Sequence, residues 1–143
     1  MTATAPAEVR EAIDELATEF GFFSDWTERY QYLIEMGDHM PPYPADKQDE
    51  EHRFHGCQSQ VWLNETWTDG RLHLEGTSDS KIVKGLIALL MRVYSGRTPD
   101  QILATDPDFL RELGLAEHLS PNRSTGLFNM VESIRRRAAE LAA

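Results

Sequence analysis

The sequence predicts an α+β fold in which a small antiparallel three-stranded sheet packs against several helices. Apolar residues recur at helical spacing near the N-terminus and throughout the C-terminal half of the chain. Between these regions, residues of alternating polarity surround an Asp-Gly pair, a pattern typical of a β-hairpin. Strands and helices that are segregated along the chain favour an α+β arrangement.

Two helices are expected before the sheet. The first covers residues 7–20, ends at Gly21, and has one apolar face: Val9, Ile13, Leu16 and Phe20. Ser24 is the expected N-cap of the second helix, and Pro41-Pro42 lies beyond its end. This second helix carries another apolar stripe at helical spacing: Trp26, Tyr30, Leu33 and Ile34.

The sheet is expected between residues 53 and 77, after a loop rich in Pro, Asp and Glu. Residues 61–66 alternate in polarity, and the pattern resumes at 72–74 after Asp69-Gly70. A short strand at 53–55 would add the third strand, which a hairpin usually needs for stability.

The remainder of the chain is expected to be helical. The first helix of this part follows Ser78-Asp79, its expected cap, has an apolar face between Ile82 and Tyr94, and ends at Gly96. Thr98-Pro99-Asp100-Gln101 has the pattern of a capping box with Pro at the first helical position. Asp106-Pro107 is expected to restart the helix, and Ser120-Pro121 to open the last one.

Length and charge narrow the classes of function. The chain has 143 residues, which suits a single domain over residues 1–143. It contains 14 Lys and Arg against 24 Asp and Glu, giving a formal net charge of −10. Nucleic acids and anionic membranes would repel such a charge, so we expect neither as a partner.

Location is predicted from two further features. The longest apolar run, Leu86 to Met91, is far shorter than a membrane span, and the first six residues have no secretory signal pattern. Cys57 is the one cysteine, so an internal disulfide is impossible and a reducing compartment is suitable. We therefore expect a cytoplasmic protein.

The lone cysteine leaves several kinds of chemistry open. It could be a small buried apolar residue or, at a turn permitted by Gly56, an accessible and reactive thiol. A hydrolase would need an activating imidazole in a recognisable context, and a dithiol redox cycle would need a second cysteine. His52, His55 and Cys57 form an H-x2-H-x-C pattern, which could supply three ligands to zinc.

The segment around this cysteine resembles the active-site signature of the SufE/CsdE family of sulfur acceptors. It reads Gly56-Cys57-Gln58-Ser59-Gln60-Val61-Trp62. Further segments resemble the family in the same order along the chain, and the resemblance extends from about Val9 to Ala139: Trp26–Tyr30, Ser78-Asp79 with Ile82–Leu86, and Leu119–Arg123 followed by Gly126, Leu127 and Met130. The resemblance implies a SufE/IscU-like fold.

The resemblance also implies a function. Similar proteins activate a PLP-dependent cysteine desulfurase, accept its sulfur as a persulfide on the cysteine matching Cys57, and pass it on for iron–sulfur cluster assembly. This implies a sulfur carrier with no cofactor or metal of its own rather than a stand-alone enzyme. Its partners would be the desulfurase and a downstream iron–sulfur scaffold or other recipient. The alternatives are a related acceptor that serves tRNA thiolation or cofactor maturation, and a zinc-binding module.

The expected site is centred on Cys57 as the sulfur-accepting nucleophile. Gly56 is the expected hinge of its loop, and Gln58 is its neighbour in the signature. Asp79 and Arg123 resemble polar residues that lie near this loop in the family; Asp79 is expected to act mainly as a helix cap, and Arg123 to have a mixed role. The resemblance further implies that the thiol rests in an apolar cavity. We do not count His55 among the expected catalytic residues.

Overall fold

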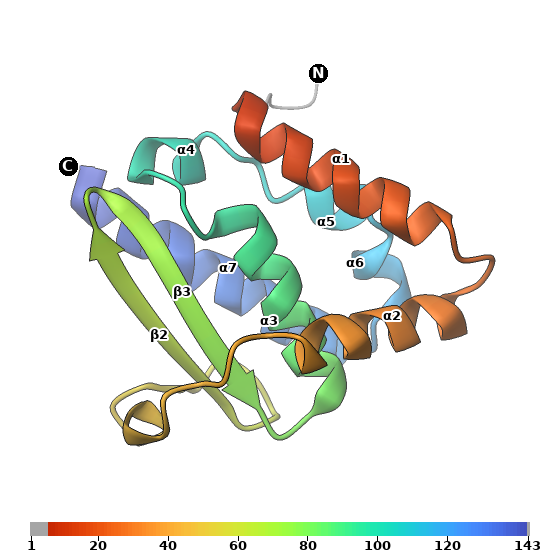
Figure 1. Ribbon diagram of the computed structural model, residues 1–143, viewed down its shortest axis with the longest axis horizontal. Helices are drawn as coiled ribbons and strands as arrows, with labels where there is room; N and C mark the ends of the chain where they lie inside the picture. The colour runs from red at the N-terminus through yellow and green to blue at the C-terminus, as the bar shows by residue number, and fades with distance from the viewer. Residues whose placement is uncertain (1–5, 143) are drawn as a thin grey trace.

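In the computed structural model, which describes residues 6–142, helix α3 packs against a three-stranded sheet and contacts the helices α1, α2 and α7 (Figure 1). The elements, in order, are α1 (Ala7–Gly21), α2 (Trp26–Asp38), a short 3-10 helix (Ala45–Lys47), β1 (Arg53–Phe54), β2 (Val61–Thr68), β3 (Arg71–Ser78), α3 (Lys81–Tyr94), α4 (Pro99–Leu103), α5 (Phe109–Glu112), α6 (Leu115–His118) and α7 (Pro121–Ala142). The predicted α+β class, with a small antiparallel sheet and several helices, is confirmed.

The sheet has the strand order β1-β2-β3 and is antiparallel throughout. The β2–β3 hairpin is paired from Val61–Ser78 to Thr68–Arg71. Its turn is the predicted Asp69-Gly70, and both residues have positive φ, 54° and 75°, as a two-residue type I′ turn requires. The short β1 pairs with the beginning of β2, so the connection between them begins and ends at the same end of these two strands.

The hydrophobic core surrounds α3, which packs against β3 on one side and α2 on another. The predicted apolar face of α1 is buried: Val9, Ile13, Leu16 and Phe20. The α2–α3 contact is very close, because a Cβ built on Gly85 would lie 2.2 Å from the backbone oxygen of Leu33. Backbone therefore packs directly against backbone where these two helices meet.

Two helix caps differ from the prediction by one or two residues. Asp25, not Ser24, caps α2, and its carboxylate accepts a hydrogen bond from the third backbone N–H of the helix (2.9 Å). Ser80, not Ser78-Asp79, caps α3. The predicted capping residues are instead engaged with Gln60, at the end of the connection between β1 and β2.

The later helix starts are partly as predicted. Thr98 and Gln101 form the expected capping box, with reciprocal side-chain to backbone bonds of 3.0 and 3.2 Å. Helix α5 begins at Phe109, two residues after the predicted start at Asp106-Pro107, and the Asp106 carboxylate accepts a 2.9 Å hydrogen bond from the backbone N–H of Asp108 in the turn that leads into it. The last helix begins at Pro121, as the Ser-Pro pair indicates.

The three tryptophans lie at the edge of the core and are half-buried. Trp26 stacks on His118 with ring centroids 4.3 Å apart, which joins α2 to α6. Trp62 lies under the guanidinium of Arg53 on the paired strand, and Trp67 packs against the core. Trp26 and Trp67 therefore belong to the margin of the core rather than to its centre.

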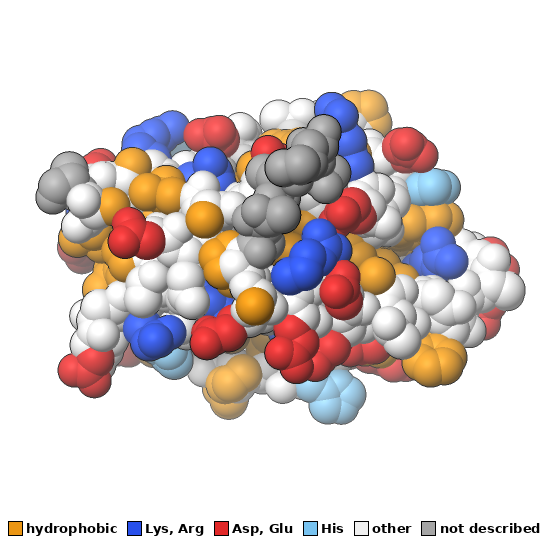
Figure 2. Space-filling model, turned by 90° about the horizontal axis from the view of Figure 1, so that it is seen from above, with side chains coloured by type: hydrophobic (Ala, Val, Ile, Leu, Met, Phe, Trp, Pro, Cys, Tyr) orange, Lys and Arg blue, Asp and Glu red, His pale blue; other side chains and the backbone are white. Residues whose placement is uncertain are grey.

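Charged groups of both signs are interleaved over α1, on the face shown in Figure 2. Arg10 on this helix forms ion pairs with Asp14 (2.9 Å) and with Glu112 of α5 (3.0 Å). No helix within residues 6–142 is long and apolar enough to cross a membrane.

Candidate functional site

Cys57 lies on the loop of residues 55–60, hereafter the cysteine loop, which joins β1 to β2 and rests on α7. Its side chain is half-buried. A Cβ built on Gly126, in the buried face of α7, would lie 2.7 Å from Cys57 Sγ and 3.3 Å from its Cβ. The missing side chain of this helical glycine therefore makes the space in which the thiol is seated.

Gly56 is required for packing rather than for an unusual backbone conformation. It is not among the glycines of the described chain that have positive φ. A Cβ at this position would lie 2.7 Å from the ring of Phe54 and 3.0 Å from the Cβ of Asn129. Gly56 thus lets the loop lie close against α7, and its expected role as a hinge stays a prediction.

Two asparagines of α7 bind the cysteine loop on either side of Cys57. Asn129 Nδ2 donates a 2.7 Å hydrogen bond to the backbone oxygen of Gly56, and Asn122 Nδ2 donates a 2.9 Å bond to Oε1 of Gln58. Asn129 is not among the residues predicted from the sequence. The sequence feature that could have indicated it is the spacing of residues 122, 126 and 129, which places all three on one face of a helix.

The far end of the cysteine loop is fixed to the end of β3. Ser78 Oγ and the backbone N–H of Asp79 both donate to the backbone oxygen of Gln60, over 2.7 and 3.2 Å. The backbone N–H of Gln60 in turn donates to Asp79 Oδ1 over 3.0 Å. Asp79 thus anchors the cysteine loop instead of capping α3.

A surface hollow of about 380 Å³ opens beside the thiol. Cys57 lines it together with five polar or charged residues: Gln58, Ser59, Ser120, Asn122 and Arg123. The Cys57 side chain also packs against the hydrophobic core, so the thiol has an apolar side and an open side that faces these polar groups. The enclosed apolar cavity that the family resemblance implies stays a prediction.

Arg123 is the one charged side chain in the lining of this hollow. It is exposed, and none of the ion pairs formed within residues 6–142 includes it. Its backbone N–H donates to Ser120 Oγ (3.4 Å) at the start of α7. The hollow thus combines a thiol with a guanidinium that is available to an incoming anionic group.

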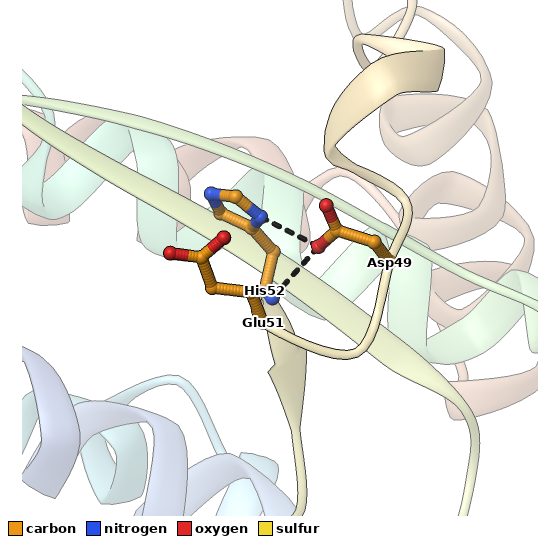
Figure 3. Close-up of side chains that lie close together, drawn as sticks. All are labelled: Asp49, Glu51 and His52. Atoms are coloured by element: carbon orange, nitrogen blue, oxygen red, sulfur yellow. Dashed lines mark hydrogen bonds and ion pairs between the residues drawn. The ribbon is translucent and has the colours of Figure 1, made fainter.

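A separate cluster of acidic residues and one histidine precedes β1 (Figure 3). His52 Nδ1 lies 2.7 Å from Asp49 Oδ1, and the same oxygen accepts the backbone N–H of His52 over 3.0 Å. The side-chain hydrogen bond from His52 lowers the pKa of the Asp49 carboxyl. These bonds close the turn that leads into the first strand, with Glu51 beside them.

The structure does not bring the H-x2-H-x-C residues together. His52 is bound to Asp49, His55 lies 3.0 Å from a carboxylate oxygen of Glu50, and Cys57 is packed against α7. The three potential ligand atoms do not gather within 4.8 Å of one another in the part of the chain that is described. This arrangement is unsuited to the three-ligand zinc site that the pattern allowed.

Comparison with known proteins assigns this site to a family. The sequence model of SufE, described as an Fe-S metabolism associated domain, matches residues 14–138. This range includes Cys57 and the residues of β3 and α7 that hold its loop. The chain belongs to the SufE family. This membership confirms the resemblance and places the protein in iron–sulfur metabolism.

Relatives of similar length support the same SufE assignment. An uncharacterised SufE-like protein of Rhizobium etli is 40% identical over 138 residues, which cover 92% of this chain and 93% of the relative. One from Rhizobium meliloti is 37% identical over 132 residues, 89% and 94% of the two chains. The solution structure of a hypothetical protein from Thermus thermophilus has the same fold, with a TM-score of 0.74 at 24% identity, and the match covers 98% of this chain and 100% of that one.

The contact between Cys57 and α7 leads to a test in this SufE-family chain. We expect Gly126→Ala to displace the thiol from its seat, because the added methyl group would lie 2.7 Å from Sγ. The rate at which iodoacetamide alkylates Cys57 in the folded protein should rise several-fold. The same rate in Gly126→Ala and native protein, measured where both are fully folded, would show that Gly126 does not hold the thiol.

Proposed function

We propose that this single-domain protein accepts sulfur on Cys57 from a PLP-dependent cysteine desulfurase, stimulates that desulfurase, and delivers the sulfur for iron–sulfur cluster assembly. The observation that carries the proposal is that the one cysteine of this SufE-family protein, Cys57, lies within the matched domain. Cys57 lies on a short surface loop, is half-buried, and opens onto a polar hollow. A second cysteine nearby would convert a persulfide into a disulfide, and this chain has none.

The proposed transfer is a thiol–persulfide exchange. The Cys57 thiolate attacks the terminal sulfur of the desulfurase persulfide and forms a new S–S bond. The old S–S bond breaks, and its electron pair leaves with the cysteine sulfur of the donor as a thiolate. Sulfane sulfur moves from one protein to the other without an external oxidant or reductant, and Cys57 now carries the persulfide.

The surrounding residues have proposed roles that follow from their positions. Arg123 provides positive charge beside the reacting sulfur atoms, which are anionic during the exchange. Gln58 shapes the hollow, while Asp79 fixes the end of the cysteine loop through Gln60. Because a reducing compartment keeps the acceptor thiol free, we place the activity in the cytoplasm.

The proposal is tested by measuring alanine release from cysteine by the PLP-dependent desulfurases of the same genome, with and without this protein. We expect one of them to be stimulated and to bind the protein in a pull-down. Absence of both effects with every desulfurase would contradict the proposal. Metal analysis of the same preparation is the second readout, since stoichiometric zinc would instead support a zinc-binding module.

A further inference from the structure

The cysteine loop is attached to α7 by one stripe of that helix. Asn122, Gly126 and Asn129 are spaced i, i+4 and i+7, so they project from the same face over two turns. Asn122 reaches Gln58, Gly126 receives the Cys57 side chain, and Asn129 reaches Gly56. Three consecutive loop residues are therefore each matched to one position of the stripe.

Few other interactions hold this loop in place. Residues 55–59 take part in no backbone–backbone hydrogen bond within the described chain. The last paired residue of β1 is Phe54, and the first of β2 is Val61. The next anchor is at Gln60, beyond the cysteine. The position of Cys57 thus depends on side chains of α7 rather than on regular secondary structure.

The two amide contacts are not equivalent. The Asn129 bond is the shorter, at 2.7 Å, and it ends on a backbone carbonyl directly before Cys57, so it fixes the main chain at that point. The Asn122 bond joins two side chains, so it holds the main chain of the loop less directly. Asn129 should therefore contribute more than Asn122 to holding the loop against the helix.

We propose that Asn129, assisted by Asn122, is a positioning residue that keeps the Cys57 thiol seated against Gly126 and so sets how readily it reacts. Loss of the amide contact would free the carbonyl of Gly56 and allow the main chain around Cys57 to leave α7. The consequence for sulfur transfer rests on the proposed function, whereas the consequence for the thiol itself does not.

The first test measures alkylation of Cys57 by iodoacetamide in the folded protein without any desulfurase. We expect Asn129→Ala to raise the rate by about two- to tenfold, the range that corresponds to losing one hydrogen bond. Asn129→Asp should also raise it, because a carboxylate cannot donate to the Gly56 carbonyl. Asn122→Ala should have a smaller effect.

The matched control is Glu132→Ala, an exposed position on the same helix for which no hydrogen bond to the loop occurs among the described residues. Its alkylation rate should equal that of the native protein. Circular dichroism at the assay temperature verifies that each variant is folded. Native alkylation rates in both folded Asn129 variants would overturn the proposal.

The second test concerns the sulfur-loaded protein. Once loaded, Asn129→Ala should lose the added sulfur to dithiothreitol several-fold faster than the native protein, because its Cys57 is less well seated. Equal loss rates would contradict a protective role of the amide contact. If neither protein takes up sulfur, the proposed function fails, and the alkylation rates still decide whether Asn129 positions the loop.

Discussion

Replacing Cys57 by serine is expected to remove both sulfur acceptance and the stimulation of cysteine turnover by the partner desulfurase. A hydroxyl cannot form a persulfide by exchange, and the chain has no other thiol to take over the role. Alanine release in the presence of the variant should fall to the rate of the desulfurase alone. The expected loss is therefore complete rather than partial.

The fold and the binding surface should survive this substitution. Cys57 is half-buried and its open side faces polar groups, so exchanging sulfur for oxygen should change the free energy of unfolding by about 1 kcal/mol or less. Most of a protein–protein interface lies outside any one side chain, so pull-down of the desulfurase should persist. Full stimulation by folded Cys57→Ser would contradict the acceptor mechanism and leave only allosteric activation.

Gly85→Ala is expected to be strongly destabilising. Its methyl group would lie 2.2 Å from the backbone oxygen of Leu33, and backbone cannot rotate away as a side chain can. Helices α2 and α3 would have to separate, which disturbs the core on both sides of α3. We expect the free energy of unfolding to fall by about 3 kcal/mol or more, measured as a lower urea midpoint.

Gly21→Ala is the matched control for this experiment. Gly21 is the last residue of α1, and a Cβ there would meet no atom within 4 Å. Alanine favours the helix over glycine, so the variant should be as stable as the native protein or more stable by up to about 1 kcal/mol. Similar urea midpoints for Gly85→Ala and Gly21→Ala would show that the α2–α3 contact tolerates expansion.

Most elements of the fold could be predicted because local signals determine them. The helical spacing from Val9 to Phe20, the Asp69-Gly70 turn and the Thr98 capping box all act through neighbours within a few residues. The cap of α3 could not be predicted in this way. Ser78-Asp79 is a suitable cap locally, but its groups are engaged by Gln60, a residue distant in sequence that only the folded sheet brings near.

The site was predicted less completely than the fold, for the same physical reason. The position of Cys57 in a loop before a strand follows from its neighbours in sequence. Its seat against Gly126 and the amide contact from Asn129 depend on how the cysteine loop packs against α7. No local pattern contains that packing, so the polar hollow and the role of α7 emerge only from the structure.

The central claim, that Cys57 carries sulfur, is tested most directly by mass spectrometry of the intact protein and its peptides. The protein is incubated with its desulfurase and free cysteine, then separated without reductant. The account predicts a single added sulfur atom on the peptide that contains Cys57, absent when cysteine is omitted. An unmodified Cys57 peptide under conditions where the desulfurase is stimulated would contradict it.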